Sequence, residues 1–298
     1  MEDENVFIRE VENVREGENK MSENNNLDIK LEMEKIREMY DSDPRSQSYN
    51  ALIYGGTGSG KTSLLRTCRL PLHLDSFDPG GSKVLQGEAI LNDKKYPDEM
   101  ARGNIMVDAR YESEDPDNPT MAEAWDKEFH RRKKMGYFDL LGTYAIDSIT
   151  TWSQTILYSV MKKAGRKGGQ PFQNDWLPQM TIIENAVRQI ISLPCDVVFI
   201  GHDDSDKDEA TGRMFISLMI TGKLKRRVPL MFDEVYYAMT KETSQGVEYQ
   251  LLTKKTGMYQ ARSRLANKGQ LEMYEKADIK NILKKAGRST EDKPSLFN

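Results

Sequence analysis

The chain has 298 residues, of which 38% are hydrophobic and 30% charged, and its net charge is −4. This length is typical of one large or two small domains, and the near-neutral charge excludes a uniformly basic nucleic-acid coat. Two cysteines and three histidines are too few for a disulfide framework or a zinc module, and no apolar run is long enough to span a bilayer. We therefore expect a cytoplasmic protein with no membrane partner.

The first 26 residues carry the acidic excess. They hold eight acidic and three basic residues and end in three asparagines, which is typical of a solvated tail. This start lacks the basic segment of a secretory signal, and Met21 is an alternative start. Residues 28–40 place apolar side chains at helical spacing before Pro44, which predicts a short docking helix or, alternatively, a partner-binding helix. Residues 1–47 would thus form an acidic tail with a short helix.

Short apolar segments alternate with helical segments from residue 48 onward. The pattern predicts strands at 51–54, 70–74, 105–107, 140–146 and 197–200, and helices from Lys61 and over 121–134, 150–164 and 176–191. This alternation is typical of an α/β fold with a mostly parallel central sheet. The later segments FDEVYYAM and VEYQLLTK predict antiparallel edge strands. This domain would span residues 48–268, followed by a C-terminal helix and a disordered tail over 269–298.

Residues 55–62 read GGTGSGKT and match the phosphate-loop pattern G-x-x-x-x-G-K-[ST] between a predicted strand and a predicted helix. Small residues let backbone N–H groups converge on phosphate oxygens, and the start of the following helix favours the same anion. Lys61 would contact the β- and γ-phosphates, and the Thr62 hydroxyl would ligate Mg²⁺. The nucleotide-binding candidates are Gly55, Gly56, Thr57, Gly58, Ser59, Gly60, Lys61, Thr62 and Ser63.

Asp147 ends a predicted buried strand, where a carboxylate can hold Mg²⁺ against the γ-phosphate. The alternative is that Asp147 caps the next helix, although Ser148 could cap it while Asp147 binds the metal. The next residue is Ser148 and not Glu, unlike the D-E pair of motor ATPases, and no D-x-x-G motif follows. The GTPase interpretation is therefore disfavoured.

The order of these segments resembles that of RecA-like ATPases. It is most similar to compact phage RecA-like proteins, which are grouped with single-strand annealing proteins and called AAA-type ATP-binding proteins. The resemblance covers about residues 48–265 and rests on four segments: 55–62, AIDS at 145–148, VVFIGH at 197–202 and TGKLKRRVPLMFDEV at 221–235. It implies a RecA-like P-loop NTPase fold, ATP and Mg²⁺ as cofactors, and a homo-oligomer that forms a ring or a filament.

The resemblance also implies catalytic roles for residues that follow the strands. Asp75 and Asp78 stand where relatives orient the attacking water, commonly with Glu, and the shorter side chain predicts slow hydrolysis. The alternative is that both aspartates shape a turn, and Glu112 and Glu114 are weaker candidates for the base. His202 occupies the position of a polar residue that senses the γ-phosphate. The catalytic candidates are thus Lys61, Asp75, Asp78 and His202.

Two basic segments correspond to DNA-binding loops of RecA-like proteins. The first contains Lys162, Lys163, Arg166 and Lys167 near the aromatic residues Phe172 and Trp176, and the second contains Lys223, Lys225, Arg226 and Arg227. Cations neutralise phosphates and aromatic rings stack on bases, whereas a solvated loop is the alternative for the first segment. The segment DDSDKDEATGR after His202 is acidic and would by itself repel a phosphate backbone. Residues 131–134 are expected to be the exposed basic end of a helix.

A neighbouring subunit usually supplies a cation to the ATP site of RecA-like proteins. The candidates for this trans-acting cation are Lys254, Lys255, Arg262 and Arg264, and solubilising charges on an edge strand are the alternative interpretation.

These observations lead to a Mg-ATP-dependent ATPase that acts on single-stranded DNA in phage recombination, annealing or replication, within the host cytoplasm. One alternative is a nucleotide-gated interaction protein that turns over little and binds a replication or recombination partner. A small-molecule kinase is less favoured, because the sequence shows no clear arginine-containing lid.

Overall fold

The computed structural model describes residues 25–43, 48–86, 104–207, 209, 212–265 and 269–295. The chain forms two compact units, Met1–Gln47 and Ser48–Asn298. In the first unit residues 25–42 are helical, which confirms the helix predicted at 28–40. Its residues Ile29, Met33 and Ile36 are spaced so that they share one side of the helix. The predicted acidic tail and Met21 lie outside the described residues. None of the helices within the described ranges has both the length and the apolar character that a bilayer span requires.

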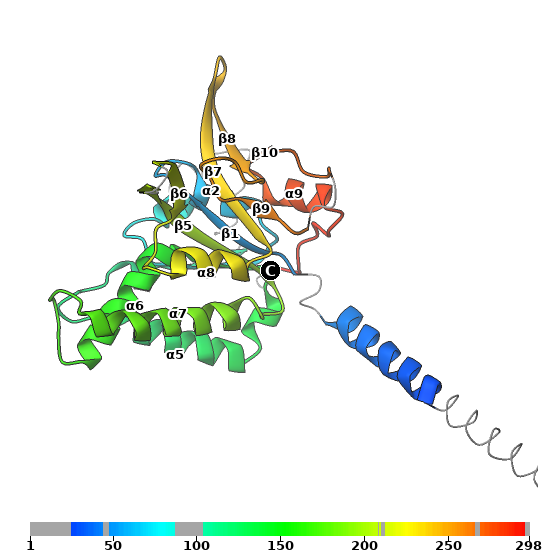
Figure 1. Cartoon of the computed structure of the whole chain (residues 1–298), viewed down its shortest axis with the longest axis horizontal. Helices are drawn as coiled ribbons and strands as arrows, with labels where there is room; N and C mark the ends of the chain where they lie inside the picture. Colours follow the sequence, from blue (N-terminus) through cyan, green and yellow to red (C-terminus); the bar gives the residue numbers. More distant parts are fainter. Residues whose placement is uncertain are drawn as a thin grey trace, which may run out of the picture. The chain divides into compact units, whose positions relative to one another are not determined.

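A ten-stranded sheet forms the centre of the second unit (Figure 1). Six strands run parallel: β1 (Asn50–Gly55), β2 (Leu72–Ser76), β3 (Ile105–Asp108), β4 (Thr143–Asp147), β5 (Asp196–Lys207) and β7 (Glu234–Thr243). Four strands pair antiparallel: β6 (Met214–Leu218), β8 (Gly246–Leu252), β9 (Arg262–Ser263) and β10 (Tyr274–Lys276). The prediction of a mostly parallel sheet with antiparallel edge strands is confirmed.

The strand order is β10-β8-β7-β1-β5-β4-β2-β3, which puts β1 between β5 and β7. In this register Gly55 at the end of β1 lies opposite His202 of β5. Asp147 at the end of β4 lies between Ile200 of β5 and Ser76 of β2. The carboxyl ends of these four strands therefore meet at one edge, where open α/β sheets bind their ligands.

Helices cover both faces of the sheet. They are α2 (Lys61–Leu64), α3 (Lys83–Gln86), α5 (Met121–Lys134), α6 (Ile149–Lys163), α7 (Trp176–Ile190), α8 (Leu224–Met231) and α9 (Ile279–Lys285), with short 3-10 turns η2 (Leu65–Thr67), η3 (Ala109–Glu112), η4 (Tyr137–Leu140) and η5 (Gln173–Asp175). The three long helices α5 to α7 match their predicted ranges within one residue at each end. Strand β2 starts two residues later than predicted, because Pro71 has no N–H to donate to a sheet ladder.

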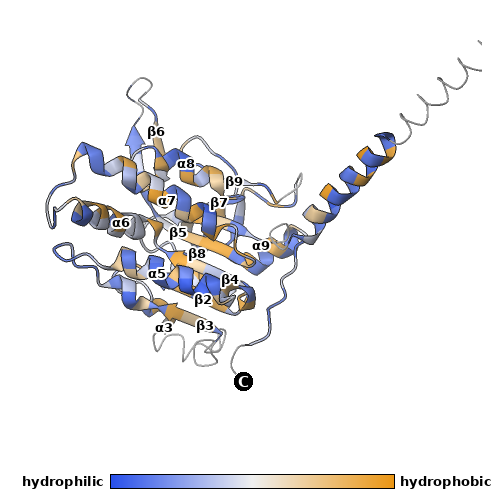
Figure 2. Ribbon diagram, turned by 90° about the horizontal axis from the view of Figure 1, so that it is seen from below, coloured by the Kyte–Doolittle hydropathy of each residue, from blue (hydrophilic) through white to orange (hydrophobic). Residues whose placement is uncertain are grey.

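Two hydrophobic layers hold these elements together. One layer joins the sheet to α5, α6, α7 and α8, through residues such as Trp125, Trp152 and Val228. The other joins the opposite face to α2 and α9, through Leu64 and Ile282. Hydrophobic colours accordingly lie along strands of the sheet in Figure 2, β5 among them.

The segment after α9 is placed differently from the disordered tail that we predicted. The Leu70 N–H donates to Asp292 Oδ1 (2.7 Å), and the Lys293 N–H donates to the Leu70 carbonyl (2.8 Å). Residues 292 and 293 thus lie against the start of β2. The residues beyond 295 are outside the described ranges.

Candidate nucleotide-binding site

The predicted phosphate loop connects β1 to α2 at the carboxyl edge of the sheet. Gly58 and Gly60 both have φ of +80°, a conformation that side-chain-bearing residues rarely adopt. Gly55 packs so closely on β7 that a Cβ built there would lie 2.3 Å from the Ala238 carbonyl oxygen. Gly55, Gly58 and Gly60 are therefore favoured by the backbone path as well as by access to a phosphate.

The Lys61 ammonium group lies over the loop. Its Nζ donates to the carbonyl oxygens of Gly55 (2.7 Å) and Gly56 (2.8 Å) and to Ser59 Oγ (3.3 Å). Burial lowers the pKa of Lys61, and nearby carboxylates, chiefly that of Asp147, oppose the effect. A phosphate bound in the loop would place a further negative charge beside this buried cation.

Thr62 and Asp147 form the candidate metal site. Thr62 Oγ1 donates to Asp147 Oδ2, across 85 positions of sequence. The Asp147 side chain is almost completely buried, and this burial raises its pKa to about 6, against the hydrogen bond from Thr62 and the charge of Lys61. A hydroxyl and a carboxylate are oxygen ligands of the kind that Mg²⁺ prefers, and a cation would offset the cost of the buried charge. The residues present therefore fit Mg²⁺.

Asp78 and His202 form an ion pair beside this metal site. His202 Nε2 lies 2.7 Å from Asp78 Oδ2, while Asp78 Oδ1 accepts hydrogen bonds from Ser148 (2.6 Å) and Thr151. Burial opposes ionisation of Asp78, but these hydrogen bonds outweigh it, so its pKa lies below the ordinary value. The hydrogen bond to Asp78 in turn raises the pKa of His202. Both predicted residues are brought together, and Asp78 is placed to hold His202 rather than to take a proton from water.

The first turn of α6 supplies hydroxyl groups that the sequence analysis missed as site residues. Besides Ser148 and Thr151, Thr150 Oγ1 accepts a hydrogen bond from the His202 N–H (3.0 Å). Ser148 Oγ also accepts from the Thr151 N–H (3.3 Å), so Ser148 is the helix cap and Asp147 is free for the metal. The run DSITT directly after a strand-end acid was the available signal.

Asp203, in the acidic segment after His202, is a second residue whose place the sequence did not reveal. Its Oδ2 accepts a hydrogen bond from the Tyr237 hydroxyl (2.9 Å), and a Cβ built on Gly56 would lie 3.9 Å from its Oδ1. Its charge also acts on Lys61. Asp203 therefore adds negative charge beside the phosphate loop and lies next to the residue predicted to sense the phosphate.

Asp75 does not belong to this site, and its predicted catalytic role is wrong. The side chain is fully buried, and it accepts hydrogen bonds from Trp125 Nε1 (2.9 Å) and the Tyr144 hydroxyl. Its other oxygen lies 2.9 Å from His73 Nε2 and 3.0 Å from Arg132 Nη1. A carboxylate enclosed by four polar partners and shielded from solvent cannot orient a water at the phosphate loop.

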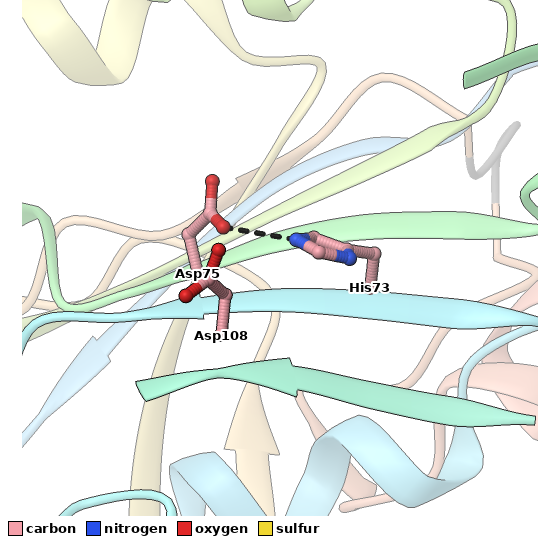
Figure 3. Close-up of side chains that lie close together, drawn as sticks. All are labelled: His73, Asp75 and Asp108. Carbon is pink, nitrogen blue, oxygen red and sulfur yellow. Dashed lines mark hydrogen bonds and ion pairs between the residues drawn. The ribbon is translucent and has the colours of Figure 1, made fainter. Parts of the chain in front are cut away.

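The side chains of His73, Asp75 and Asp108 gather in a cluster with the spacing of metal ligands (Figure 3). Arg132 fills the position of a cation in this cluster. Its Nη1 lies 3.0 Å from both His73 Nε2 and Asp75 Oδ1, and its Nη2 donates to Asp108 Oδ2. A guanidinium that neutralises two buried carboxylates removes the need for a metal ion. The cluster is therefore a structural charge network.

The two glutamates considered as alternative bases have structural partners. Glu112 accepts hydrogen bonds from Ser76 Oγ (2.7 Å) and from the backbone N–H groups of Gly80 (3.0 Å) and Ser82 (3.2 Å). Glu114 accepts from the Thr120 N–H (2.9 Å) before α5. Glu112 thereby fixes the turn that carries Asp78, and Glu114 supports the start of α5.

The first predicted DNA-binding cluster is largely engaged within the molecule. Lys162 Nζ donates to the Pro119 carbonyl (2.7 Å), and Lys163 lies 3.6 Å from Glu123. Arg166 pairs with Asp175 and stacks over the Phe172 ring at 4.2 Å from its centroid, whereas Lys167 is exposed.

The second cluster lies around the start of α8 and is partly free. Lys225 Nζ pairs with Asp204 (2.8 Å) and Asp206 (3.0 Å) of β5, and Arg227 pairs with Glu184 (2.9 Å). Lys223 and Arg226 are exposed and form no ion pair within the described part of the chain. The acidic segment is thus neutralised in part by Lys225, which reduces the repulsion that we predicted.

The four trans-acting cation candidates fall into two groups. Arg262 Nη2 donates to the carbonyl oxygens of Pro229 (2.8 Å) and Phe232 (2.7 Å), and Arg264 lies 3.3 Å from Asp233. Both arginines adjoin the start of β7, at the end of the strand opposite the phosphate loop. Lys254 and Lys255 are exposed after β8.

Comparison with known proteins gives one family match and distant structural likenesses. A KaiC-like protein from Pyrococcus horikoshii OT3 has 12% identity and a TM-score of 0.39, over 69% of this chain and 78% of that chain. The flagellar accessory protein FlaH from Methanocaldococcus jannaschii has 9% identity and a TM-score of 0.35, over 67% and 75%. No curated protein matches the chain. The family model described as an AAA domain matches residues 47–265, nearly the range that holds the phosphate loop and the parallel sheet. The chain therefore belongs to this AAA domain family.

Proposed function

We propose that the protein is a Mg-ATP-dependent ATPase whose turnover is stimulated by single-stranded DNA. The observation that carries the hydrolytic part is the contact of Thr62 with the buried carboxylate of Asp147, beside Lys61. These groups would hold the β- and γ-phosphates and their metal ion. Mg²⁺, when bound, supplies charge neutralisation on the phosphate oxygens.

His202 is the residue that would contact the γ-phosphate. Its carboxylate partner Asp78 fixes the ring and raises its pKa, which favours the cationic imidazolium. Negative charge on the γ-phosphoryl oxygens is stabilised by fixed cations, and Lys61 and His202 provide two of them. Water attacks phosphorus, the bond to the ADP oxygen breaks, and the proton of the water passes to a phosphoryl oxygen, so that ADP and inorganic phosphate are the products. Because the oxygens of Asp78 are engaged, we expect slow turnover in the absence of a second ligand.

The DNA part of the proposal is supported by two adjoining grooves at the start of α8. One groove, of about 660 Å³, is lined by Trp176, Lys223 and Arg227 among others. The other, of about 740 Å³, shares Lys223 and Arg227 and adds Arg226. Exposed cations next to an aromatic ring suit a single strand, because cations bind its phosphates while rings stack on its unpaired bases.

Strand β5 gives the grooves a physical connection to the nucleotide. It carries His202 at the phosphate loop and, within four residues, Asp204 and Asp206 on Lys225. A DNA phosphate that binds Lys225 would compete with these carboxylates. The resulting change at β5 would reach the residue that senses the γ-phosphate.

Phosphate release in the presence and absence of an oligo(dT) strand tests the proposal. We expect DNA to raise the rate in the wild type, and Lys61→Ala to abolish it under both conditions. The double variant K223A/R226A should keep the basal rate and lose the stimulation. The matched control is the double variant K133A/K134A, which removes two exposed charges from the end of α5 and is called the α5 control. Hydrolysis that DNA never changes would refute the DNA part.

One observation favours a second candidate function. The engagement of Asp78 with His202, Ser148 and Thr151 suits a protein that binds ATP and hydrolyses it rarely. Such a protein would be a nucleotide-gated module for a replication or recombination partner. In either case we propose a phage role in the host cytoplasm and a ring or filament of copies, in which exposed Lys254 or Lys255 supplies the cation to a neighbour's ATP. A high DNA-stimulated turnover would discard the second candidate.

A further inference from the structure

The phosphate loop has different neighbours on its two sides. The groups suited to the metal ion and the γ-phosphate, Asp147 and His202, come from β4 and β5 on one side of β1. On the other side lie β7 and its antiparallel partner β8. A triphosphate whose γ-end is held between Lys61 and His202 must direct its nucleoside end away from β4 and β5. The strands on that side are β7 and β8.

Strands β7 and β8 form a hairpin that extends past the loop. Their pairing runs from Tyr237 opposite Leu252 to Thr243 opposite Gly246. Because Ala238 is the residue that packs on Gly55, the hairpin residues beyond it continue past the end of β1. Figure 1 shows this hairpin projecting from the sheet.

Tyr249 is the aromatic residue of this hairpin that contacts the loop. A Cβ built on Gly60 would lie 2.6 Å from Cδ1 of Tyr249, so the ring packs directly on the glycine before Lys61. The side chain is still 47% exposed. Val247 is two residues earlier in the same strand and is 56% exposed, so the two apolar side chains share one face of β8.

We propose that Tyr249 forms the nucleobase subsite of the ATP site, with its ring stacking on the base and Val247 extending the apolar surface. This inference rests on the proposed binding of a nucleoside triphosphate at the loop. Three observations carry it: the side of β1 on which Tyr249 lies, its contact with Gly60, and the exposure of the residue to solvent. Stacking uses the flat face that every base has, and it therefore discriminates little between bases.

The test compares ATP with inorganic tripolyphosphate, which has the same phosphates and no base. Isothermal titration with Mg²⁺ present would be performed on wild type, Y249A and Y249F. We expect Y249A to weaken ATP binding about tenfold, with tripolyphosphate binding unchanged and Y249F close to wild type. GTP should lose the same factor as ATP. The matched control is Y274A, which removes a 46% exposed tyrosine from β10 and should change neither affinity.

The outcomes separate this subsite from the proposed function. Unchanged ATP binding by Y249A would overturn the subsite alone. An equal loss for ATP and tripolyphosphate would also overturn it, because Tyr249 would then only support the shape of the loop. A wild type that binds neither ligand would overturn the nucleotide site itself, and the subsite with it. Far-ultraviolet circular dichroism of each variant checks that the fold is kept.

Discussion

Replacing Asp147 with asparagine should abolish turnover and at the same time stabilise the nucleotide-free protein. The side chain is 2% exposed, and burial raises the pKa of its carboxyl from 3.8 to about 6. At 1.36 kcal/mol per pKa unit, the ionised carboxylate costs about 3 kcal/mol of folding free energy. Asparagine has nearly the same shape, keeps an oxygen that can accept from Thr62, and carries no charge.

The stability that D147N gains over the wild type should be larger at high pH than at low pH. A carboxyl whose pKa is higher in the folded state destabilises the fold fully above pH 6, and the cost declines as the pH falls toward 3.8. Urea unfolding should therefore show D147N to be more stable than the wild type by about 1–3 kcal/mol at pH 8, and by about half as much at pH 5. The variant D139N, which changes an exposed carboxylate, is the control and should match the wild type at both pH values.

The same variant should lose phosphate release by a factor of about 10² or more, because a neutral amide is a poor ligand for Mg²⁺. A D147N protein that is no more stable than wild type at pH 8 would contradict the buried-charge account. Wild-type turnover in D147N would contradict the assignment of Asp147 to the metal. The two results are independent, since stability is measured without nucleotide.

Three further predictions concern the charged groups. Replacing Arg132 with alanine should destabilise the protein by about 3–5 kcal/mol in urea unfolding, because two buried carboxylates lose their cation. An R132A protein as stable as the wild type would contradict this charge network. The variant D78N should keep ATP affinity within about twofold and lose at least about tenfold in turnover. Its loss of activity at alkaline pH should begin at a lower pH than in the wild type, because His202 loses the partner that raises its pKa. An unchanged pH profile would contradict the pairing of Asp78 with His202. K223A/R226A should make the fall of log affinity for oligo(dT) with log salt less steep by about 1.4, the value for two phosphate contacts on a single strand. A slope as steep as that of the α5 control would mean that the DNA binds elsewhere.

Local patterns were sufficient to predict most of the fold. The alternation of apolar and polar residues located the long helices within a residue, and the spacing of Gly55, Gly60 and Lys61 defined the phosphate loop. These signals arise within one element, because the backbone conformation of a helix or a glycine turn depends mainly on neighbouring residues. Asp147 was predictable for the same reason, as the polar residue that ends an apolar strand.

Most other contacts between distant elements could not be predicted. Asp78 and Asp75 are three residues apart and were equal candidates, yet one lies in the turn beside His202 and the other in a buried network. The choice depends on the register of β2 against β4 and on a partner 124 positions away. Arg132 was expected to be exposed with its basic neighbours, but its place on α5 turns it toward the sheet and buries it. Tyr249 belongs to a strand whose alternating pattern shows two faces without showing which face meets the loop.

Phosphate release from ATP by the purified wild type and by Lys61→Ala, with Mg²⁺ and with chelator, tests the central claim most directly. The account predicts a Mg²⁺-dependent rate in the wild type and none above background in the variant, because Lys61 lies over the loop that would hold the phosphates. Equal rates in the two proteins, or a wild type that neither binds nor hydrolyses ATP, would contradict it.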